Sequence, residues 1–179
     1  AWVPGVRVGY SKNFTGSELS KVHLVEVQDG TQTNSYFVNR TNNNLSGFYS
    51  LMELEDEIWI GSDNGEIQVY NTSDKHFSLI KLKTQSKIKD IKSINDKLVL
   101  ISSEDDGFFI YNRTKSKAEH FNTTNLAGMK NNSILYSYID RSGNMWFELD
   151  HSGVAMLNVK HQNMKHFEAK NEGKVTNLL

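Results

Sequence analysis

The chain has 179 residues, which is enough for one substantial domain. Its 20 basic and 21 acidic residues nearly cancel, so the composition provides no positively charged surface for nucleic acid or for an anionic membrane. Zero cysteines exclude disulfides, thiolate catalysis and cysteine metal sites, and no apolar run approaches the ~20 residues of a membrane-spanning helix, so we expect no direct membrane insertion by this segment.

Residues 1–47 form the least regular part of the sequence. Residues 1–10 resemble the middle two strands of the unit that follows them, and residues 22–27 and 36–39 look like further strands. We therefore expect this region to be a divergent or partial copy of that unit.

A unit of short strands then occurs three times. Each copy has an apolar strand, a turn that ends in glycine, a second strand that ends in asparagine, and a later His-Phe pair. The repeated residues are Gly65, Asn71 and His76-Phe77 in the first copy, Gly107, Asn112 and His120-Phe121 in the second, and Gly153, Asn158 and His166-Phe167 in the third. Such a repeat of about 40 to 50 residues, built from short strands, is typical of β-propeller blades.

Each unit is expected to fold as an antiparallel meander of four strands, counted from the inside outward. The consecutive apolar residues at 98–101 indicate a strand that is buried on both faces, as when blades stack on each other. The expected strands are 48–54, 58–61, 66–70 and 76–82, then 88–94, 98–102, 108–111 and 118–121, and finally 134–139, 145–148, 154–157 and 164–167.

The sequence therefore predicts an all-β fold in which four-stranded antiparallel blades form a partial propeller over residues 1–179. Two interpretations stay open. Either the chain is a piece of a longer propeller, or its end strands complete one shared blade and close a small ring. Free blade edges in a piece predict a homo-oligomer or edge-to-edge association. The expected segments are a partial blade at 1–47, blades at 48–87, 88–133 and 134–170, and the start of a further blade at 171–179, where residues 175–179 resemble an inner strand.

Histidines and tryptophans that could carry chemistry are better explained by the scaffold. Equivalent positions on successive blades lie apart around a ring, so His76, His120 and His166 are not expected to converge on a metal ion. Trp59 and Trp146 could stack on sugars, but their apolar neighbours in the sequence favour the core between blades.

The acidic residues lead to the same conclusion. The carboxylates at 53–57 are neighbours in one turn, whereas glycosidase carboxylates face each other across the scissile bond. Asp63, Asp105 and Asp106 provide one or two carboxylates per turn, which is fewer than a calcium loop needs. We therefore expect no catalytic residue, no metal and no cofactor.

Propeller geometry does indicate where a ligand would bind. The connections between blades and the turns between the second and third strands of each blade share one face. The connection at 123–133 is long and polar, and long ordered loops often carry function. The candidate ligand-binding residues on this face are Asp63, Asn64, Asp105, Asp106, Asn125 and His151.

The third unit also carries a family resemblance. Residues 136–146 read Tyr-Ser-Tyr-Ile-Asp-Arg-Ser-Gly-Asn-Met-Trp, and Gly153 and Asn158 follow. This pattern resembles the two-component regulator propeller repeat, which has an inner strand, an Asp-x-x-Gly-Asn turn, a strand with tryptophan and a glycine that opens the next strand. The first unit resembles it with Glu-Asp-Glu in place of the glycine turn, and the second departs furthest, with Val99 where tryptophan is expected.

Such repeats occur in the extracytoplasmic sensor regions of bacterial hybrid two-component regulators, where they usually form seven-bladed propellers that detect glycan fragments and signal to a kinase. The resemblance implies a non-catalytic sensor segment in the periplasmic or extracytoplasmic part of an inner-membrane protein. Its implied partners are an oligosaccharide ligand and the remainder of the parent sensor. Two alternatives stay open: a propeller scaffold for protein interaction, and a propeller-fold glycan hydrolase or lyase.

Overall fold

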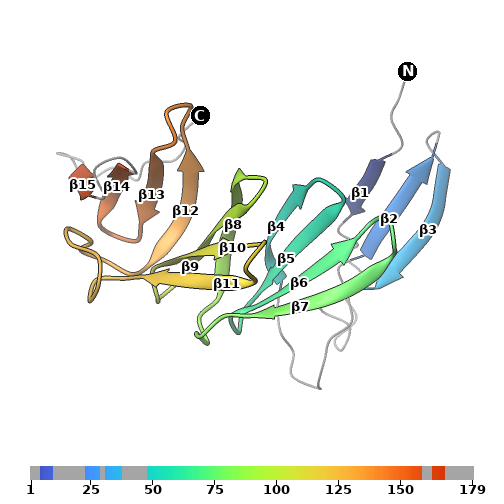
Figure 1. The fold of residues 1–179 in the computed structure, drawn as a ribbon, viewed down its shortest axis with the longest axis horizontal. Coiled ribbons are helices and arrows are strands. Elements are labelled where there is room, and N and C mark those ends of the chain that lie inside the picture. The colour runs from blue at the N-terminus through green and yellow to red at the C-terminus, as the bar shows by residue number, and fades with distance from the viewer. Residues whose placement is uncertain (1–4, 10–22, 29–30, 38–47, 159–162, 168–179) are drawn as a thin grey trace.

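The computed structural model describes residues 5–9, 23–28, 31–37, 48–158 and 163–167, and Figure 1 shows them as a row of β-sheets. The first sheet has three strands in the order β1-β2-β3. These strands are β1 (Gly5–Gly9), β2 (His23–Gln28) and β3 (Thr31–Phe37). The regular structure of the described residues consists entirely of strands.

Three four-stranded sheets follow, and each is an antiparallel meander in which chain neighbours pair. The all-β prediction and the prediction of four-stranded blades are thereby confirmed. The first blade contains β4 (Phe48–Leu54), β5 (Glu57–Ser62), β6 (Glu66–Asn71) and β7 (His76–Lys81). The second contains β8 (Ile88–Asn95), β9 (Leu98–Ser103), β10 (Phe108–Asn112) and β11 (Lys117–Phe121). The third contains β12 (Ile134–Ile139), β13 (Met145–Leu149), β14 (Gly153–Asn158) and β15 (Asn163–Phe167).

The sheets stand side by side in chain order, which is an open, partial propeller (Figure 1). The first strands of the three blades run in the same direction in this view, and β4 contacts β8 while β8 contacts β12. The first strand of each blade is therefore its innermost strand. Pairing proceeds outward from it, so β7, β11 and β15 form the outer edges of the blades.

A β-bulge interrupts each innermost strand at the same place. The register shifts between Phe48 and Ser50, between Ile88 and Asp90, and between Ile134 and Tyr136. A bulge bends its strand and re-aims the side chains beside it. In the first two blades the residue after the bulge binds the next blade. Ser50 donates a hydrogen bond to the carbonyl oxygen of Ile88 at 3.0 Å, and Asp90 accepts one from the backbone of Ser137 at 2.9 Å.

Two apolar clusters fill the junctions between the blades. Trp59 and Ile67 of the first blade pack with Ile101 and Phe109 of the second. Leu100 and Phe108 of the second blade pack with Phe147 and Leu157 of the third, and the rings of Phe108 and Phe147 stack at 4.7 Å. The second blade thus buries both of its faces, as its consecutive apolar residues predict, and Trp59 is part of the core.

Strand register corrects the expected place of the missing tryptophan. Trp59 pairs with Val69, and Trp146 pairs with Met156, in both cases two positions before the terminal asparagine of the third strand. The same position in the second blade pairs Leu100 with Ile110. Leu100, and not Val99, therefore replaces tryptophan in that blade.

The His-Phe pair is likewise not equivalent in all three blades. Phe121 and Phe167 pair with Phe108 and Val154, near the beginning of the third strand. Phe77 instead pairs with Tyr70, next to the end of that strand. The pair therefore holds the same place in the second and third blades, whereas in the first blade it lies at the opposite end of the third strand.

The division of the whole chain into blade segments stays a prediction. Of the two strands expected at 1–10, the second corresponds to β1, and residues 1–4 lie outside the described residues. The strand expected at 22–27 corresponds to β2, and the strand expected at 36–39 overlaps the end of β3. The inner strand expected at 175–179 lies outside the described residues. The described residues contain no helix that is long and apolar enough to span a membrane.

A carboxylate in the turn before the tryptophan explains the Asp-x-x-Gly-Asn-x-Trp pattern of the third blade. Asp140 accepts hydrogen bonds from the indole nitrogen of Trp146 at 3.0 Å, from the side chain of Asn144 at 2.8 Å and from the backbone nitrogen of Ser142 at 2.9 Å. The bond from Trp146, followed by that from Asn144, lowers the pKa of Asp140 from 3.8 to about 2. In the first blade Glu57 accepts the Trp59 indole hydrogen bond at 2.9 Å.

We expect the Asp140 turn to loosen in acid. Because the pKa of Asp140 is depressed in the folded state, its contribution to stability is present above pH 3.8 and is lost as the pH falls toward about 2. Tryptophan fluorescence should therefore show a transition with a midpoint near pH 2. The Asp140→Asn variant should lack this transition. A transition that persists in the variant would assign it to another group.

Candidate functional site

The connections between blades and the turns between second and third strands lie against each other. We call this surface the loop face; it comprises the turns 62–65, 103–107 and 150–152 and the connections 82–87 and 122–133. Backbone hydrogen bonds join Glu104 to Lys87 at 2.9 Å and Gly107 to Asn132 at 2.8 Å. In the third blade the backbone of Asp150 donates to the Ser133 carbonyl at 3.0 Å. These bonds fix the connections on the turns, so the loop face is an ordered surface within the described residues.

Positive backbone dihedrals shape the turns of the loop face. Gly65, Gly107 and Gly153 have φ values of 74°, 71° and 74°. A residue with a Cβ is strained in this region of conformational space. An added Cβ at Gly65 or Gly107 would also meet the backbone of the neighbouring segment. Gly65 and Gly107 are therefore required both by the turn and by the close approach of the chain, and Gly153 is required by the turn.

The turn residues Asn64 and Asp106 are held in place by side chains of neighbouring residues. The amide of Asn64 donates to Glu66 at 3.2 Å, and its oxygen accepts a hydrogen bond from Ser62. The backbone oxygen of Asp106 lies 2.7 Å from Nε2 of His120, and a carboxylate oxygen lies 3.2 Å from the same nitrogen.

Asn125 joins the Asp106 group, whereas Asp63, Asp105 and His151 lie elsewhere on the loop face. The Asn125 side chain donates to the backbone of His120 at 2.9 Å, so the structure brings Asn125 and Asp106 to one histidine. The Asp105 backbone donates to the hydroxyl of Ser86 at 2.9 Å and its side chain is exposed. His151 is exposed at the tip of the third turn, and Asp63 is half-buried in the first.

A second group of residues lies at the inner rim of the loop face. We define the inner-rim cluster as Tyr49, Lys87, Lys89 and Glu104. Lys87 binds Glu104 at 2.7 Å and Lys89 binds it at 3.4 Å. The ammonium of Lys87 also lies 4.6 Å from the centre of the Tyr49 ring, which is close enough for a cation–π contact. The hydrogen bond between Lys87 and Glu104 raises the pKa of Lys87 and lowers the pKa of Glu104, so both side chains stay charged at neutral pH.

The inner-rim cluster offers an exposed aromatic ring beside paired charges. Its two lysines and one glutamate carry a net charge of +1, and Asp105 follows Glu104 in the sequence. This chemistry suits a ligand with many hydroxyl groups and apolar C–H faces, because charged donors and acceptors bind hydroxyls and aromatic rings contact C–H groups. The sequence did not indicate this cluster, since its residues come from two blades and lie far apart along the chain.

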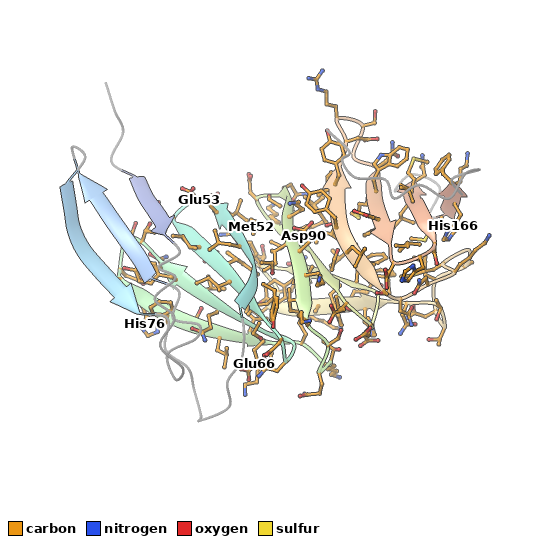
Figure 2. All side chains as sticks on the ribbon, turned by 180° about the vertical axis from the view of Figure 1, so that it is seen from behind. Met52, Glu53, Glu66, His76, Asp90 and His166 are labelled. Carbon is orange, nitrogen blue, oxygen red and sulfur yellow. The ribbon has the colours of Figure 1, made fainter. Side chains whose placement is uncertain are left out.

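The histidines and the turn carboxylates have other partners. Nε2 of His166 lies 2.6 Å from the Gly128 carbonyl, and the ring of His120 stacks on Phe109 at 4.3 Å. Figure 2 places His76 and His166 at opposite ends of the row of sheets. No group of three potential metal ligands occurs among the described residues. The turn residues Glu55 and Glu57 each bind Arg113 at 3.0 Å, which ties the first blade to the second.

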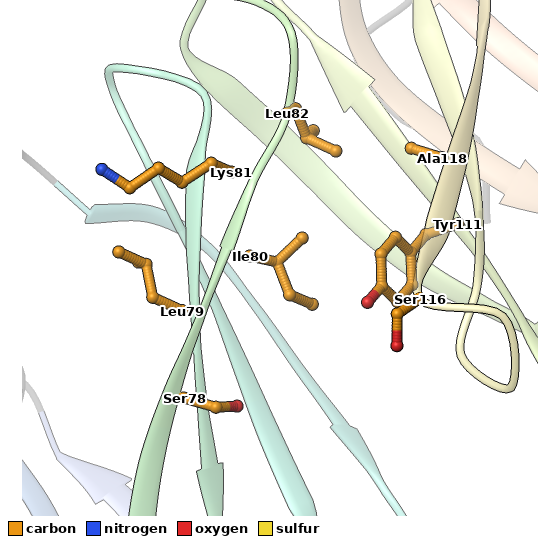
Figure 3. Close-up of a pocket in the computed structure, with 8 residues that line it drawn as sticks. All are labelled: Ser78, Leu79, Ile80, Lys81, Leu82, Tyr111, Ser116 and Ala118. Carbon is orange, nitrogen blue, oxygen red and sulfur yellow. The ribbon is translucent and has the colours of Figure 1, made fainter.

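A groove of about 400 Å³ lies on the outer side of the first junction, shown in Figure 3. Its apolar lining includes Leu79 and Ile80 from β7, and Tyr111 and Ala118 from the second blade. The groove therefore runs along the outer edge strand of the first blade, at the rim opposite the inner-rim cluster.

Comparison with known structures finds similar folds. No family model matches the sequence, and no curated protein matches it. The extracellular domain of a proposed hybrid two component system from B. thetaiotaomicron matches the structure with a TM-score of 0.66 at 16% identity, over 86% of this chain and 24% of that chain. A second such domain from the same organism has a TM-score of 0.59 at 16% identity, over 78% of this chain and 20% of that chain.

A propeller of another kind is also similar. The β-propeller domain of Swd1 from Myceliophteria thermophila has a TM-score of 0.62 at 10% identity, over 82% of this chain and 52% of that chain. Structural matches at such low sequence identity show similarity of fold alone. The chain spans about a quarter or less of the length of the extracellular sensor domains that it matches.

Proposed function

We propose that the chain is a non-catalytic sensor segment of a hybrid two-component regulator, in the periplasmic or extracytoplasmic part of an inner-membrane protein. The observation that carries the proposal is its structural likeness to the extracellular domains of such systems, together with the third-blade pattern that resembles their repeat. The kinase that receives the signal would belong to the remainder of the parent chain.

We place the ligand on the loop face and take it to be an oligosaccharide. The inner-rim cluster supplies an exposed tyrosine and charged hydrogen-bonding groups, and Asp105 and Asp106 adjoin it in the second turn. A backbone hydrogen bond between Lys87 and Glu104 also joins the connection that ends at Lys87 to the turn that contains Glu104. A ligand bound there would contact the first and second blades together and change how they pack.

Ligand binding should stabilise the chain in a thermal unfolding experiment with a panel of neutral and acidic oligosaccharides. A ligand at 100 times its Kd stabilises the folded state by about 2.7 kcal/mol. The Lys87→Ala variant should need at least about tenfold more ligand for the same increase in stability, because it loses a charge-assisted hydrogen bond of about 1.5–3 kcal/mol.

Lys115→Ala is the matched control, since Lys115 is exposed in the turn between β10 and β11, on the opposite face of the second blade. This variant should respond to ligand as the parent chain does. A flat response across the whole panel would remove the support for sugar sensing, and turnover of any oligosaccharide would favour a hydrolase or lyase.

A scaffold for protein interaction is the second candidate, and the outer groove favours it. Leu79 is exposed beside this groove on β7, which pairs only with β6 among the described strands. An extended peptide could add to such an edge by β-strand pairing. Loss of peptide or protein binding in a Leu79→Lys variant, with no response to sugars, would support this candidate over the sensor.

A further inference from the structure

The outer groove occupies the outer gap of the first junction, which is the space between the outer strands of two neighbouring blades. One wall carries Ile80 of β7, and the other carries Tyr111 and Ala118 of the second blade (Figure 3). Counting back from the asparagine that ends each third strand, and across to the paired residue, gives the equivalent positions at the second junction. The equivalents are Phe121 for Ile80, Leu157 for Tyr111 and Met164 for Ala118.

At the second junction the connection at 122–133 supplies apolar side chains to this space. The connection turns on itself, because the backbone nitrogen of Met129 donates to the carbonyl oxygen of Leu126 at 3.1 Å. Met129 is 6% exposed and belongs to the apolar cluster that contains Leu157 and Met164, and Leu126 packs against the same cluster. Two apolar side chains, three residues apart in a turn, therefore fill the second junction from outside.

Both walls of the second junction hold this connection in place. On the wall of the second blade, the side chain of Asn125 donates to the backbone oxygen of His120 at 2.9 Å. On the wall of the third blade, Nε2 of His166 lies 2.6 Å from the carbonyl oxygen of Gly128. A Cβ at Gly128 would lie 2.9 Å from the carbonyl oxygen of Met164, so the connection lies directly against β15. The outer gap of a blade junction thus accepts a turn of polypeptide with apolar residues three positions apart.

The first junction leaves the same gap open. Its connection, residues 82–87, is half as long as 122–133, and the only apolar side chain that it brings to the groove is that of Leu82. Ala118 also takes up less space than the equivalent Met164. The resulting volume of about 400 Å³ is in the range of about 300–1,000 Å³ that is usual for ligand pockets. Both blades beside the groove have all four strands, so it belongs to an interior junction of the row.

Exposed lysines stand at both ends of the outer groove. Lys83 follows the lining residue Leu82, and Lys115 precedes the lining residue Ser116 in the turn between β10 and β11. Glu66, on the strand that pairs with β7, is already bound to Lys81 at 2.8 Å. Charges of one sign at the rim of an interface favour a partner of the opposite sign. The groove therefore combines an apolar floor with ends that suit carboxylates.

We propose that the outer groove binds an acidic segment of a partner protein, which inserts leucine or methionine side chains three residues apart between the first and second blades. The partner takes the place that Leu126 and Met129 take at the second junction. Methionine fills irregular apolar gaps well because it is flexible, and anchors three or four residues apart are the usual way in which a turn of helix enters a groove. Carboxylates beside these anchors pair with Lys83 and Lys115.

This mode of binding depends on the partner's side chains, whereas strand addition to β7 depends on its backbone. It also involves no residue of the inner-rim cluster, so it does not rest on an oligosaccharide at the loop face. The two modes and the two sites can therefore be tested separately.

Selection from a displayed library of random peptides, with the full 179-residue chain as bait, tests the proposal. The peptides have the length of the connection at 122–133. Those that bind should be enriched in leucine or methionine three residues apart and in aspartate and glutamate. A fluorescent copy of the strongest binder then gives a Kd for each variant of the chain by fluorescence anisotropy.

Ala118→Trp should weaken this binding at least about tenfold, because the indole fills the groove between Ile80 and Tyr111. Glu119→Trp is the matched control. Glu119 is exposed and adjacent on β11, and alternation along the strand points its side chain to the other face of the sheet. This variant should bind as the parent chain does.

Reversing the charge at both ends of the groove, with Lys83→Glu and Lys115→Glu together, should weaken binding at least about tenfold and reduce its dependence on salt. Thermal unfolding without peptide shows whether each variant folds. The charge reversal changes only exposed side chains, so it decides the question if Ala118→Trp does not fold.

A library that yields no binder, or binders whose Kd is unchanged by both the Ala118→Trp and the charge-reversed variants, would overturn the proposal. Binders that lack the apolar pair and lose affinity only in Leu79→Lys would assign the site to strand addition on β7, which overturns it as well. These experiments contain no sugar. Their failure therefore leaves the sensor function standing, and a flat response to the oligosaccharide panel leaves the docking site standing.

Discussion

Replacing Gly61 with alanine should destabilise the chain by about 2–3 kcal/mol, as overpacking in a tight core does. A Cβ at this position would lie 2.6 Å and 2.8 Å from two side-chain carbons of Ile88, and it would also overlap the hydroxyl of Ser50. Ser50 cannot move aside freely, because it donates to the backbone of Ile88 at 3.0 Å. The junction between the first and second blades would have to open to admit one methyl group.

Ser102→Ala is the matched control, since Ser102 holds the equivalent position in the second blade. Its hydroxyl is fully buried and makes no hydrogen bond within the described part of the chain. Removing it should change stability by less than about 0.5 kcal/mol, because the unpaired hydroxyl contributes little that is favourable. Urea denaturation of both variants measures the difference. Equal losses would show that the two junctions are not packed as the structure has them.

Local patterns in the sequence predicted the blades well because propeller strands pair with their chain neighbours. Turn glycines mark where the meander reverses, and Asn71 ends a strand by accepting hydrogen bonds from the backbones of Ser73 and Asp74. All twelve blade strands overlap the ranges expected for them. The residues that pair lie close together along the chain, so the spacing of residue types in the sequence is enough to predict the pairing of these strands.

Two register errors show where local patterns stop. Val99 and Leu100 are both apolar, and only pairing with β10 decides which of them faces the third blade as Trp59 faces the second. Phe77 follows a histidine as Phe121 does, but Phe77 is the second residue of β7 and Phe121 is the last residue of β11, so the two pair at different ends of the third strand. The same dipeptide in two blades therefore does not mark the same place in the fold.

The candidate site was predicted as a surface and not as a set of contacts. The sequence indicated the turns with Asn64, Asp105 and Asp106, and these lie on the loop face. It did not indicate that Lys87 and Lys89 share Glu104, or that Tyr49 lies under Lys87. The contact between Tyr49 and Lys87 reaches from the first blade to the segment that leads into the second, and Tyr49 and Lys89 lie at bulges that appear only when the strands are paired.

Removing the side chain of Asp90 should cost about 3 kcal/mol or more, the effect expected when a buried charge network loses one member. Asp90 is 7% exposed and lies near the middle of the row of blades (Figure 2). One carboxylate oxygen accepts from the backbone nitrogen and hydroxyl of Ser137 at 2.9 Å and 2.7 Å. The other lies 3.1 Å from the backbone nitrogen of Ile91 and 3.0 Å from the ammonium of Lys92.

The Asp90→Ala variant therefore leaves the two donors of the buried Ser137 without their partner, and it leaves Lys92 without its carboxylate. A double-mutant cycle with Ser137→Ala separates the link between blades from the rest, and we expect a coupling energy of about 1 kcal/mol or more. Asp96→Ala, at an exposed turn of the same blade, should change stability by less than about 0.5 kcal/mol. If Asp90 and Asp96 cost the same, the second and third blades are held together by their apolar cluster alone, and the carboxylate after the bulge has no part in joining them.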